Sequence, residues 1–298
     1  MANERVEKGW QKKGIGTYST EAILGTLGHY GVSVSEDSLR TKMKDLYPMA
    51  IAEEWHRSWK GLGQFSLFPL AAVSELFKRW APDVLLPEQV AQKLGDLLMA
   101  LAQLIAGSPE APVGTTLSAF QELKPRIPLQ EGEVKVSYVE EIFGYLGESG
   151  MKAFEEMTGR LIHDGHLDDA QDFAEIEEFL FPNRRGITTA LVRAAQGEKA
   201  EAITSLVAIA EDSARVGPSQ LFAVDALLEL KAAKEAQPLA VRLLDEAEKA
   251  EDFHLALALC ERLTKMFKEQ GDRTSMRALE ERFEELVRSH QEAHPGHH

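Results

Sequence analysis

The sequence predicts an all-α protein, in which an N-terminal helical bundle is followed by an α-α superhelix. Residues 186–290 contain no strand-like stretch and have the apolar spacing of successive amphipathic helices. A short pattern recurs in and just before this region: a Gly or an acidic residue is followed five residues later by Ala. Such a pattern predicts a tight turn, with a small residue where the second helix crosses the first. It occurs as Gly165 with Ala170, Gly197 with Ala202, and Glu251 with Ala256.

The composition predicts a folded, cytoplasmic protein. Apolar residues make up 44% of the 298 residues, which is enough for a sizeable core and excludes disorder as the global state. The single cysteine, Cys260, excludes an internal disulfide framework, and its position on an apolar helix predicts a buried thiol. The longest apolar stretch, residues 97–107, is shorter than the about 20 residues that span a membrane. The polar start contains no signal-peptide core, so we expect no membrane insertion.

The net charge of −15 is concentrated in the middle of the chain. Residues 1–130 contain 14 Lys/Arg and 14 Asp/Glu, whereas residues 131–182 contain 3 Lys/Arg against 14 Asp/Glu. Because this acidic block would repel a phosphate backbone, we do not expect nucleic-acid binding. The block is either a solvated face that keeps the protein soluble or a docking surface for a basic partner.

The first part of the chain predicts five helices. Ser19 is a suitable N-cap for the first, which Gly31 ends. Ser35 is a suitable N-cap for the second, which ends before Pro48. Pro87 suits the first turn of the fifth. The predicted helices cover residues 19–30, 35–47, 49–60, 67–80 and 87–106.

Two irregular stretches separate the halves of the chain. Residues 107–115 have the composition of a linker, and residues 124–136 are irregular with short extended structure near their end. Ser137 with Glu140 then predicts a capping box. We therefore predict two domains: a charge-neutral, tryptophan-containing helical bundle in residues 1–130, and an acidic helical-repeat domain with a frayed, histidine-containing tail in residues 131–298.

Two short segments of the chain resemble each other. Residues 21–31 and 140–150 are identical at six of eleven positions, including three glycines. Shared glycines predict the same helix crossing and the same helix stop in both segments. Chance similarity between Gly- and Leu-rich helices is the alternative.

The second half predicts eight further helices. Asp272 is a suitable N-cap for the last one, whose apolar residues follow a spacing of three and four. The predicted helices cover residues 151–164, 167–181, 187–196, 199–214, 218–232, 238–249, 252–270 and 273–291.

This half of the chain resembles the tetratricopeptide class of helical hairpin repeats, whose period is about 34 residues. The best unit is residues 183–216, in which Ala190, Gly197, Ala202 and Leu206 match the small, turn and packing positions of the family. The aromatic and Leu-Gly positions of the family's first helix are missing, and the alanine spacing is 32 and then 54 residues. A general α-α superhelix is therefore the alternative. Two further units retain fewer matches, Gly165 and Ala170 in one and Ala256 and Leu263 in the other.

Motifs of known catalytic chemistry are missing from the sequence. It contains no G-x-S-x-G, H-E-x-x-H or C-x-x-C motif. The two Gly-x-Gly motifs, at residues 14–16 and 61–63, lack a third glycine and a preceding strand, so we interpret them as helix-entry turns. We therefore expect no catalytic residues and no cofactor.

One cluster contains the residue types of a metal site. His163, Asp164, His166 and Asp168 are the candidate ligands, since acids fall at several positions of a calcium-binding loop counted from Asp164. However, Asp169 occupies the loop position that requires Gly. The alternative is an interhelical turn with acids at the N-terminus of the next helix, which the helix dipole favours.

The candidate interaction residues are aromatic and basic. Trp55 and Trp59 are four residues apart on one helix face, which predicts either a core stripe or a binding patch. Arg184 and Arg185 lie beside the acidic block, where they either contact an acidic partner or neutralise neighbouring carboxylates. Arg193, on the next helix, completes the set.

These features together favour a non-enzymatic adaptor. Stacked helical repeats present a long concave groove, which suits another protein or a peptide, a basic one in one interpretation. The first alternative is a regulatory sensor with a small-molecule pocket in the N-terminal bundle near the tryptophans. The second alternative is an all-α metal-dependent enzyme that uses residues 163–175.

Overall fold

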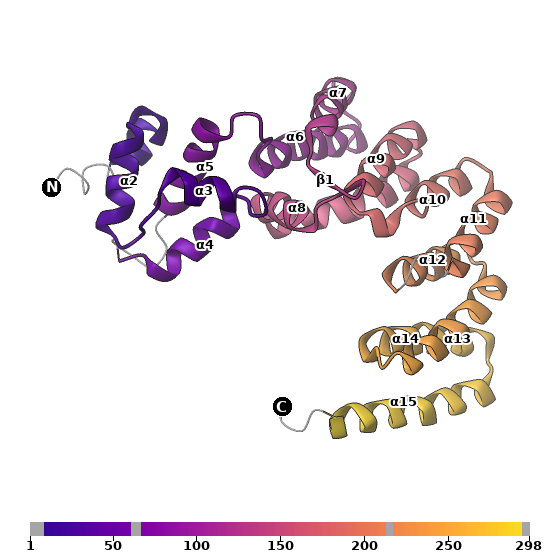
Figure 1. Cartoon of the computed structure of the whole chain (residues 1–298). Helices are drawn as coiled ribbons and strands as arrows, with labels where there is room; N and C mark the ends of the chain where they lie inside the picture. Colours follow the sequence, from indigo (N-terminus) through magenta and orange to yellow (C-terminus); the bar gives the residue numbers. More distant parts are fainter. Residues whose placement is uncertain (1–8, 61–66, 213–216, 294–298) are drawn as a thin grey trace. The chain divides into compact units, whose positions relative to one another are not determined.

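The chain has an all-α fold, as predicted (Figure 1). The computed structural model describes residues 9–60, 67–212 and 217–293. Within these ranges, extended structure is confined to one antiparallel hairpin, in which β1 (Leu129–Gln130) pairs with β2 (Glu133–Val134).

The chain divides into two compact units, Met1–Glu156 and Met157–His298. This division differs from the predicted domain boundary at residue 130. It falls near the end of one long helical element, α8 (Val136–Asp164), and most of α8 therefore belongs to the first unit. Because α8 begins at Val136, Ser137 lies inside its first turn and is not the predicted N-cap.

Long-range hydrogen bonds explain why the start of α8 belongs to the first unit. The Tyr138 hydroxyl donates to the backbone carbonyl of Leu85 at 2.8 Å. The Glu141 carboxylate accepts hydrogen bonds from the backbone N–H groups of Met49 at 3.0 Å and Ala50 at 2.8 Å. Glu141 therefore caps the N-terminus of the helix that begins at residue 48, where a negative charge is favourable.

Most helices of the first unit lie close to the predicted residues. Ser19 accepts a hydrogen bond from the N–H of Ala22, and Ser35 forms a capping box with Ser38, so both N-caps are confirmed. The second predicted helix, residues 35–47, ends at Lys42, five residues earlier than predicted. The helices before α8 are α2 (Thr20–His29), α3 (Glu36–Lys42), α4 (Pro48–Ser58), α5 (Phe68–Trp80), α6 (Pro87–Ile105) and α7 (Val113–Leu123).

Helix α7 was not predicted, because residues 107–115 have the composition of a linker. Within α7, the Ser118 hydroxyl donates to the backbone carbonyl of Gly114 at 2.8 Å, so this polar group is satisfied inside the helix. Phe120 is 0% exposed and anchors the helix to the first unit. One buried aromatic side chain is too weak a periodic signal to reveal a helix in the sequence.

One hydrophobic cluster of the first unit lies mainly between α2, α4 and α5. Its members are apolar side chains spaced by three or four residues along each helix, which is the spacing of one buried face. The most completely buried are Ile23, Leu27, Ile51, Phe68, Ala72, Val73, Leu76 and Phe77.

Gly147 interrupts α8 with φ 69° and ψ 175°. This conformation is essentially restricted to glycine. The corresponding glycine of residues 21–31, Gly28, lies inside α2, and that helix is followed by Gly31 with φ 95°. In residues 140–150 the helix is therefore interrupted at Gly147, one glycine earlier in the shared pattern than the end of α2. The two segments do not share the predicted helix stop.

Gly147→Ala is expected to lower the free energy of unfolding by about 1–3 kcal/mol, because alanine is strained in this conformation. A Cβ at Gly147 would meet nothing within 4 Å, so the backbone alone determines the cost. Urea denaturation measures the change. Gly159→Ala in the helical part of α8, where a Cβ also has space, is the control and should stabilise by about 0.5–1 kcal/mol. Equal effects at the two glycines would contradict the expectation.

The second unit is a succession of packed helices (Figure 1). From α9 to α15, each helix contacts the next one along the chain, α11 also contacts α13, and α12 also contacts α14. Asp272 accepts a hydrogen bond from the N–H of Ser275, which confirms the predicted N-cap. The helices after α8 are α9 (Leu167–Leu180), α10 (Thr188–Ala195), α11 (Lys199–Glu211), α12 (Pro218–Glu229), α13 (Ala233–Lys249), α14 (Phe253–Gln270) and α15 (Arg273–Ala293).

The recurring turn pattern has the predicted geometry. Its first residue has a positive φ and its alanine is fully buried. A fourth instance, Lys231 with φ 57° and Ala236 with 0% exposure, was missed because lysine occupies the turn. Ala202 and Ala236 are 34 residues apart, which equals the period typical of tetratricopeptide repeats, about 34 residues. The predicted instances have φ of 83° at Gly165, 102° at Gly197 and 56° at Glu251, with 0% exposure at Ala170, Ala202 and Ala256.

Each of the last three helices, α13, α14 and α15, carries one arginine that bonds to the helix two before it in the chain. Arg242, Arg262 and Arg282 are spaced by 20 residues in the sequence. We call their contacts the arginine bridges. Since each contact spans two helix layers, the bridges fix the rotation of one helix pair on the next. The acceptors are the Ala210 carbonyl for Arg242 (2.6 Å), both Asp225 oxygens for Arg262 (2.8 and 2.9 Å), and Asp245 (2.5 Å) with Glu248 (2.6 Å) for Arg282.

Candidate functional site

The two tryptophans that predicted either a core stripe or a binding patch lie in the core of the first unit. Trp55 is 5% exposed. The Trp59 ring stacks on Phe68 with centroids 5.9 Å apart and lies 4.8 Å from the ring of Tyr30. Their ring surfaces are therefore occupied by packing, which agrees with the core-stripe interpretation.

Arg184 is part of a buried ionic network in the second unit. Its guanidinium pairs with Glu177, which is 3% exposed and also accepts a hydrogen bond from Thr158 at 3.0 Å. The guanidinium carbon lies 5.5 Å from the ring centroid of Phe181 and 5.3 Å from that of Phe222. Arg184 therefore neutralises a buried carboxylate and stacks on aromatic rings, which occupies the groups that a partner would contact.

The other two candidate arginines are on the surface. Arg185 follows the 3₁₀ turn η3 (Pro182–Arg184), and Arg193 lies on α10; both are exposed. Both side chains are therefore accessible to a partner.

The candidate metal ligands lie at the turn between α8 and α9. Gly165 has φ 83°, His166 is the residue before α9, and Asp168 is in the first turn of that helix. Among the residues that the structure describes, no group of three or more His, Cys, Asp or Glu side chains could hold a metal ion. The geometry agrees with the interhelical-turn interpretation.

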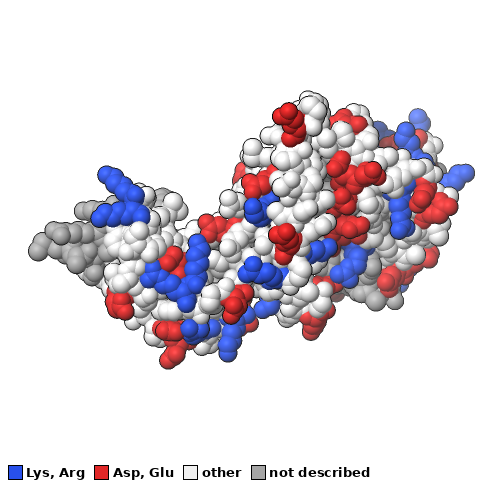
Figure 2. Space-filling model, turned by 90° about the horizontal axis from the view of Figure 1, so that it is seen from above, with Lys and Arg blue, Asp and Glu red and all other residues white. Residues whose placement is uncertain are grey.

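Carboxylates gather on the first half of α9. Burial raises the pKa of Asp172, and the neighbouring carboxylates of Glu175, Asp169 and Asp168 raise it further. Because these charges repel one another, the face favours a positively charged group. Figure 2 presents one face of the molecule, on whose described residues the Lys and Arg side chains form small separate groups and no continuous basic surface of the kind that binds a phosphate backbone.

A cavity of about 270 Å³ lies in the first unit. Helix α5 supplies much of its lining, and the segment that contains Trp10, the 3₁₀ turn η1 (Ile15–Thr17), α6 and α8 also contribute. Apolar side chains therefore meet a small number of polar groups, which is the usual composition of a ligand pocket. The apolar wall includes Trp10, Ile15 and Leu70, and the polar lining includes Ser74, Glu88 and Tyr145.

Tyr145 lines this cavity, but its hydroxyl is buried and not accessible from it. Its nearest polar neighbour in the described part of the chain is the Ser74 side chain, at a geometry looser than a normal hydrogen bond. Burial raises the pKa of Tyr145 to about 12, the carboxylates of Glu141 and Glu88 add to the rise, and the nearby Ser74 side chain opposes it. The phenol is therefore neutral at pH 7 and can both donate and accept a hydrogen bond.

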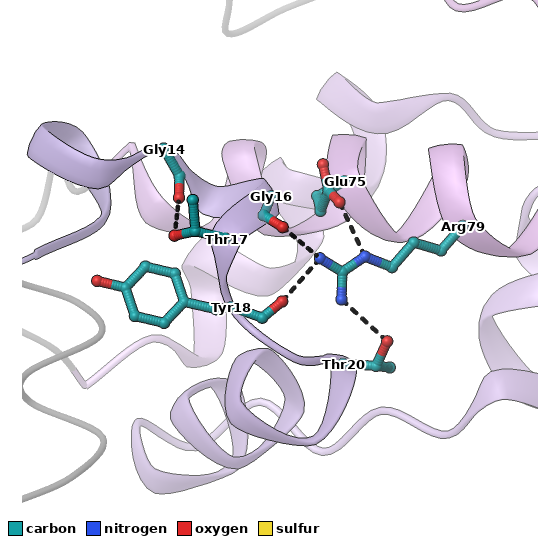
Figure 3. Close-up of polar contacts among 7 residues, drawn as sticks. All are labelled: Gly14, Gly16, Thr17, Tyr18, Thr20, Glu75 and Arg79. Carbon is teal, nitrogen blue, oxygen red and sulfur yellow. Dashed lines mark hydrogen bonds and ion pairs between the residues drawn. The ribbon is translucent and has the colours of Figure 1, made fainter.

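Arg79 holds the chain segment that forms part of the cavity wall (Figure 3). Its guanidinium donates to the Glu75 carboxylate at 2.8 Å and to the Thr20 hydroxyl at 3.0 Å. It also donates to the backbone carbonyls of Gly16 at 3.3 Å and Tyr18 at 2.8 Å. These four bonds fix the turn η1 beside α5.

The remaining features of the sequence have structural roles. The Gly-x-Gly motif at residues 14–16 leads through η1 into α2, as a helix-entry turn, while the motif at residues 61–63 lies outside the described residues. Cys260 is 2% exposed, and burial raises the pKa of its thiol to about 11, so the thiol is protonated at neutral pH. In the described part of the chain, no helix has the length and apolar character needed to cross a membrane.

No protein-family model, no curated protein and no solved structure matches this chain. Two features went unpredicted. The cavity joins residues that are far apart in the sequence, and no sequence signal connects them. The arginine bridges do have a signal, because Arg242, Arg262 and Arg282 are evenly spaced, but their spacing of 20 residues differs from the period of about 34 residues of the helical hairpins.

Proposed function

We propose that the protein is a non-enzymatic adaptor whose second unit binds a protein or peptide partner. The packing of α9 to α15 is the observation that supports this function, since each helix contacts its neighbours and the arginine bridges join helices two apart. Stacked helices of this kind form an extended surface whose shape is fixed by many small interfaces. Such a surface suits a macromolecular partner.

We further propose that the partner is basic. Residues 131–182 contain 3 Lys/Arg against 14 Asp/Glu, and four of these carboxylates act on one another on α9. A cationic partner would relieve this repulsion and be steered toward the surface. Because exposed charges are screened by salt, the interaction should weaken between about 0.05 M and about 0.5 M ionic strength.

Affinity purification of the full-length protein from cells that naturally produce it tests this function. We expect a basic protein to co-purify in a fixed stoichiometry at low ionic strength and to dissociate at high ionic strength. Combined Asp168→Asn, Asp169→Asn and Asp172→Asn substitutions should weaken binding about tenfold, since three charge pairs at one exposed and two half-buried carboxylates each contribute about 0.2–1 kcal/mol.

A matched variant controls for net charge. Glu198→Gln, Glu201→Gln and Glu211→Gln remove the same number of negative charges, all exposed, from the ends of α11. This variant should retain the partner. Equal losses in the two variants would contradict docking on α9, and a co-purifying protein that stays bound at high ionic strength would contradict the electrostatic part of the proposal.

A ligand-responsive regulator is the second candidate function. The cavity in the first unit favours it, because apolar side chains such as Trp10 and Leu70 line that space together with a few polar ones. In this function a small molecule would bind the first unit and alter the second. Amide hydrogen exchange of the full chain, measured with and without a ligand, would detect such a response as changed protection in α9 to α15.

A further inference from the structure

The cavity of the first unit has the size of a site for a small organic molecule. Its volume is about 270 Å³, and it is partly open, so a ligand can enter from solvent. A closed apolar cavity of about 150 Å³ holds one benzene molecule, so in proportion this space holds roughly ten non-hydrogen atoms. A ligand of this size is one substituted ring or a short branched chain.

Apolar side chains form a continuous part of the cavity wall. Trp10 and Ile15 lie on one side, and Leu70 and Ala71 of α5 complete the apolar lining. Leu67, just before α5, also lines the cavity and is 60% exposed, so the apolar surface extends from the wall to the solvent. Water against a concave apolar wall has few hydrogen-bond partners, and its displacement by an apolar molecule is favourable.

The charged and polar lining residues do not favour an ion. The Tyr145 hydroxyl is buried and not accessible from the cavity. The Glu75 carboxylate pairs with Arg79 at 2.8 Å. Lys78 and Glu88 are both exposed and carry opposite charges, so their effects on a ligand oppose each other and solvent screens both. A charged group that entered the cavity would therefore lose hydration without gaining a partner.

We propose that this cavity binds a small, uncharged, apolar molecule. The apolar body of the ligand packs against Trp10, Ile15 and Leu70, and a polar end group points toward the open side of the cavity, where it stays hydrated. This proposal specifies the ligand of the second candidate function and rests on it, whereas it is independent of the adaptor function.

Binding of phenethyl alcohol to the full-length protein tests the proposal. Phenethylamine and phenylacetate have nearly the same size and shape, but they carry a positive and a negative charge. In an NMR titration of the tryptophan indole N–H signals, phenethyl alcohol should shift the Trp10 signal saturably. The signals of Trp55 and Trp80, which are buried and do not line the cavity, should stay unchanged.

The charged analogues determine the ligand class. Phenethylamine and phenylacetate should each bind about three- to tenfold more weakly than the alcohol, because the cavity offers no partner for their charges. Absence of a saturable Trp10 shift with phenethyl alcohol, or tighter binding of either charged analogue, would overturn the proposal.

Variants locate the site. Ala71→Leu fills the cavity and should weaken phenethyl alcohol binding at least about tenfold, whereas Ala119→Leu, at a half-buried alanine of α7 outside the lining, should not. Leu67→Ser removes apolar surface at an exposed position, where the core is not disturbed, and should weaken binding about three- to tenfold. Leu129→Ser, at an exposed leucine outside the lining, is its matched control. Unchanged binding in both site variants would overturn the assignment.

The remaining outcomes separate this proposal from the function on which it rests. If a charged analogue binds more tightly than the alcohol and changes hydrogen exchange in α9 to α15, the uncharged class is wrong while the regulator function stands. If phenethyl alcohol binds as expected but hydrogen exchange in α9 to α15 does not change, the ligand site stands and the regulator function fails.

Discussion

Glu141→Ala is expected to destabilise the protein by about 3 kcal/mol, because two hydrogen bonds to a buried carboxylate are lost together. Glu141 is 5% exposed, and its carboxylate accepts from the N–H groups of Met49 and Ala50. Removing the carboxylate leaves the N–H groups of Met49 and Ala50 without this acceptor. The contact between α8 and the start of α4 is lost at the same time. Urea denaturation followed by circular dichroism measures the loss.

The adjacent residue provides a control. Glu140 is exposed on the same helix, so Glu140→Ala should change the free energy of unfolding by no more than about 0.5 kcal/mol. If both substitutions had the same effect, the loss would come from the helix as a whole and not from the cap that Glu141 provides to α4.

The pH dependence of stability gives a second readout at Glu141. Burial raises the pKa of Glu141, although the hydrogen bonds from Ala50 and Met49 lower it in part. The pKa of Glu141 is higher in the folded than in the unfolded protein, so the folded protein binds this proton more tightly. The free energy of unfolding is therefore higher when Glu141 is protonated, and it falls as the pH rises through the folded-state pKa. Acidification from pH 7 to about pH 4 should therefore stabilise the wild type relative to Glu141→Gln. A relative loss over this interval would contradict the raised pKa.

Ala236→Leu is expected to destabilise the second unit by about 2–3 kcal/mol, because the added side chain has no space at a helix crossing. Ala236 is 0% exposed on α13, which contacts α11, α12 and α14. Overpacking at this position should separate the layers on both sides of it. Amide hydrogen exchange would locate the effect as increased exchange in α11 to α14.

Ala200→Leu is the matched control for this substitution. Ala200 is exposed on α11, where leucine gains or loses little intrinsic helix stability. An Ala236→Leu protein as stable as the control would show that the helix crossing tolerates a large side chain. The buried alanine of the turn pattern would then not be required for packing.

The sequence by itself determined the fold class and most helices. Amphipathic spacing and N-caps such as Ser19, Ser35 and Asp272 depend on residues close in the chain, so they are readable without tertiary contacts. The turn pattern was also readable, because a positive φ and a buried alanine five residues later are both local requirements of a tight helical hairpin. The turn at Lys231 was not predicted, because lysine is not a residue typical of a positive φ, and the 20-residue spacing of the arginine bridges was not predicted either.

Only the tertiary structure decided where the units divide and which residues are accessible. The first part of α8 belongs to the first unit because Tyr138 and Glu141 bond to residues more than fifty positions away. Arg184 is an internal counter-ion because Glu177 is buried beside it. The cavity brings Tyr145 of α8 together with residues of α5 and α6. These properties depend on which apolar faces meet, and periodicity along one helix does not specify the partner against which its face is buried.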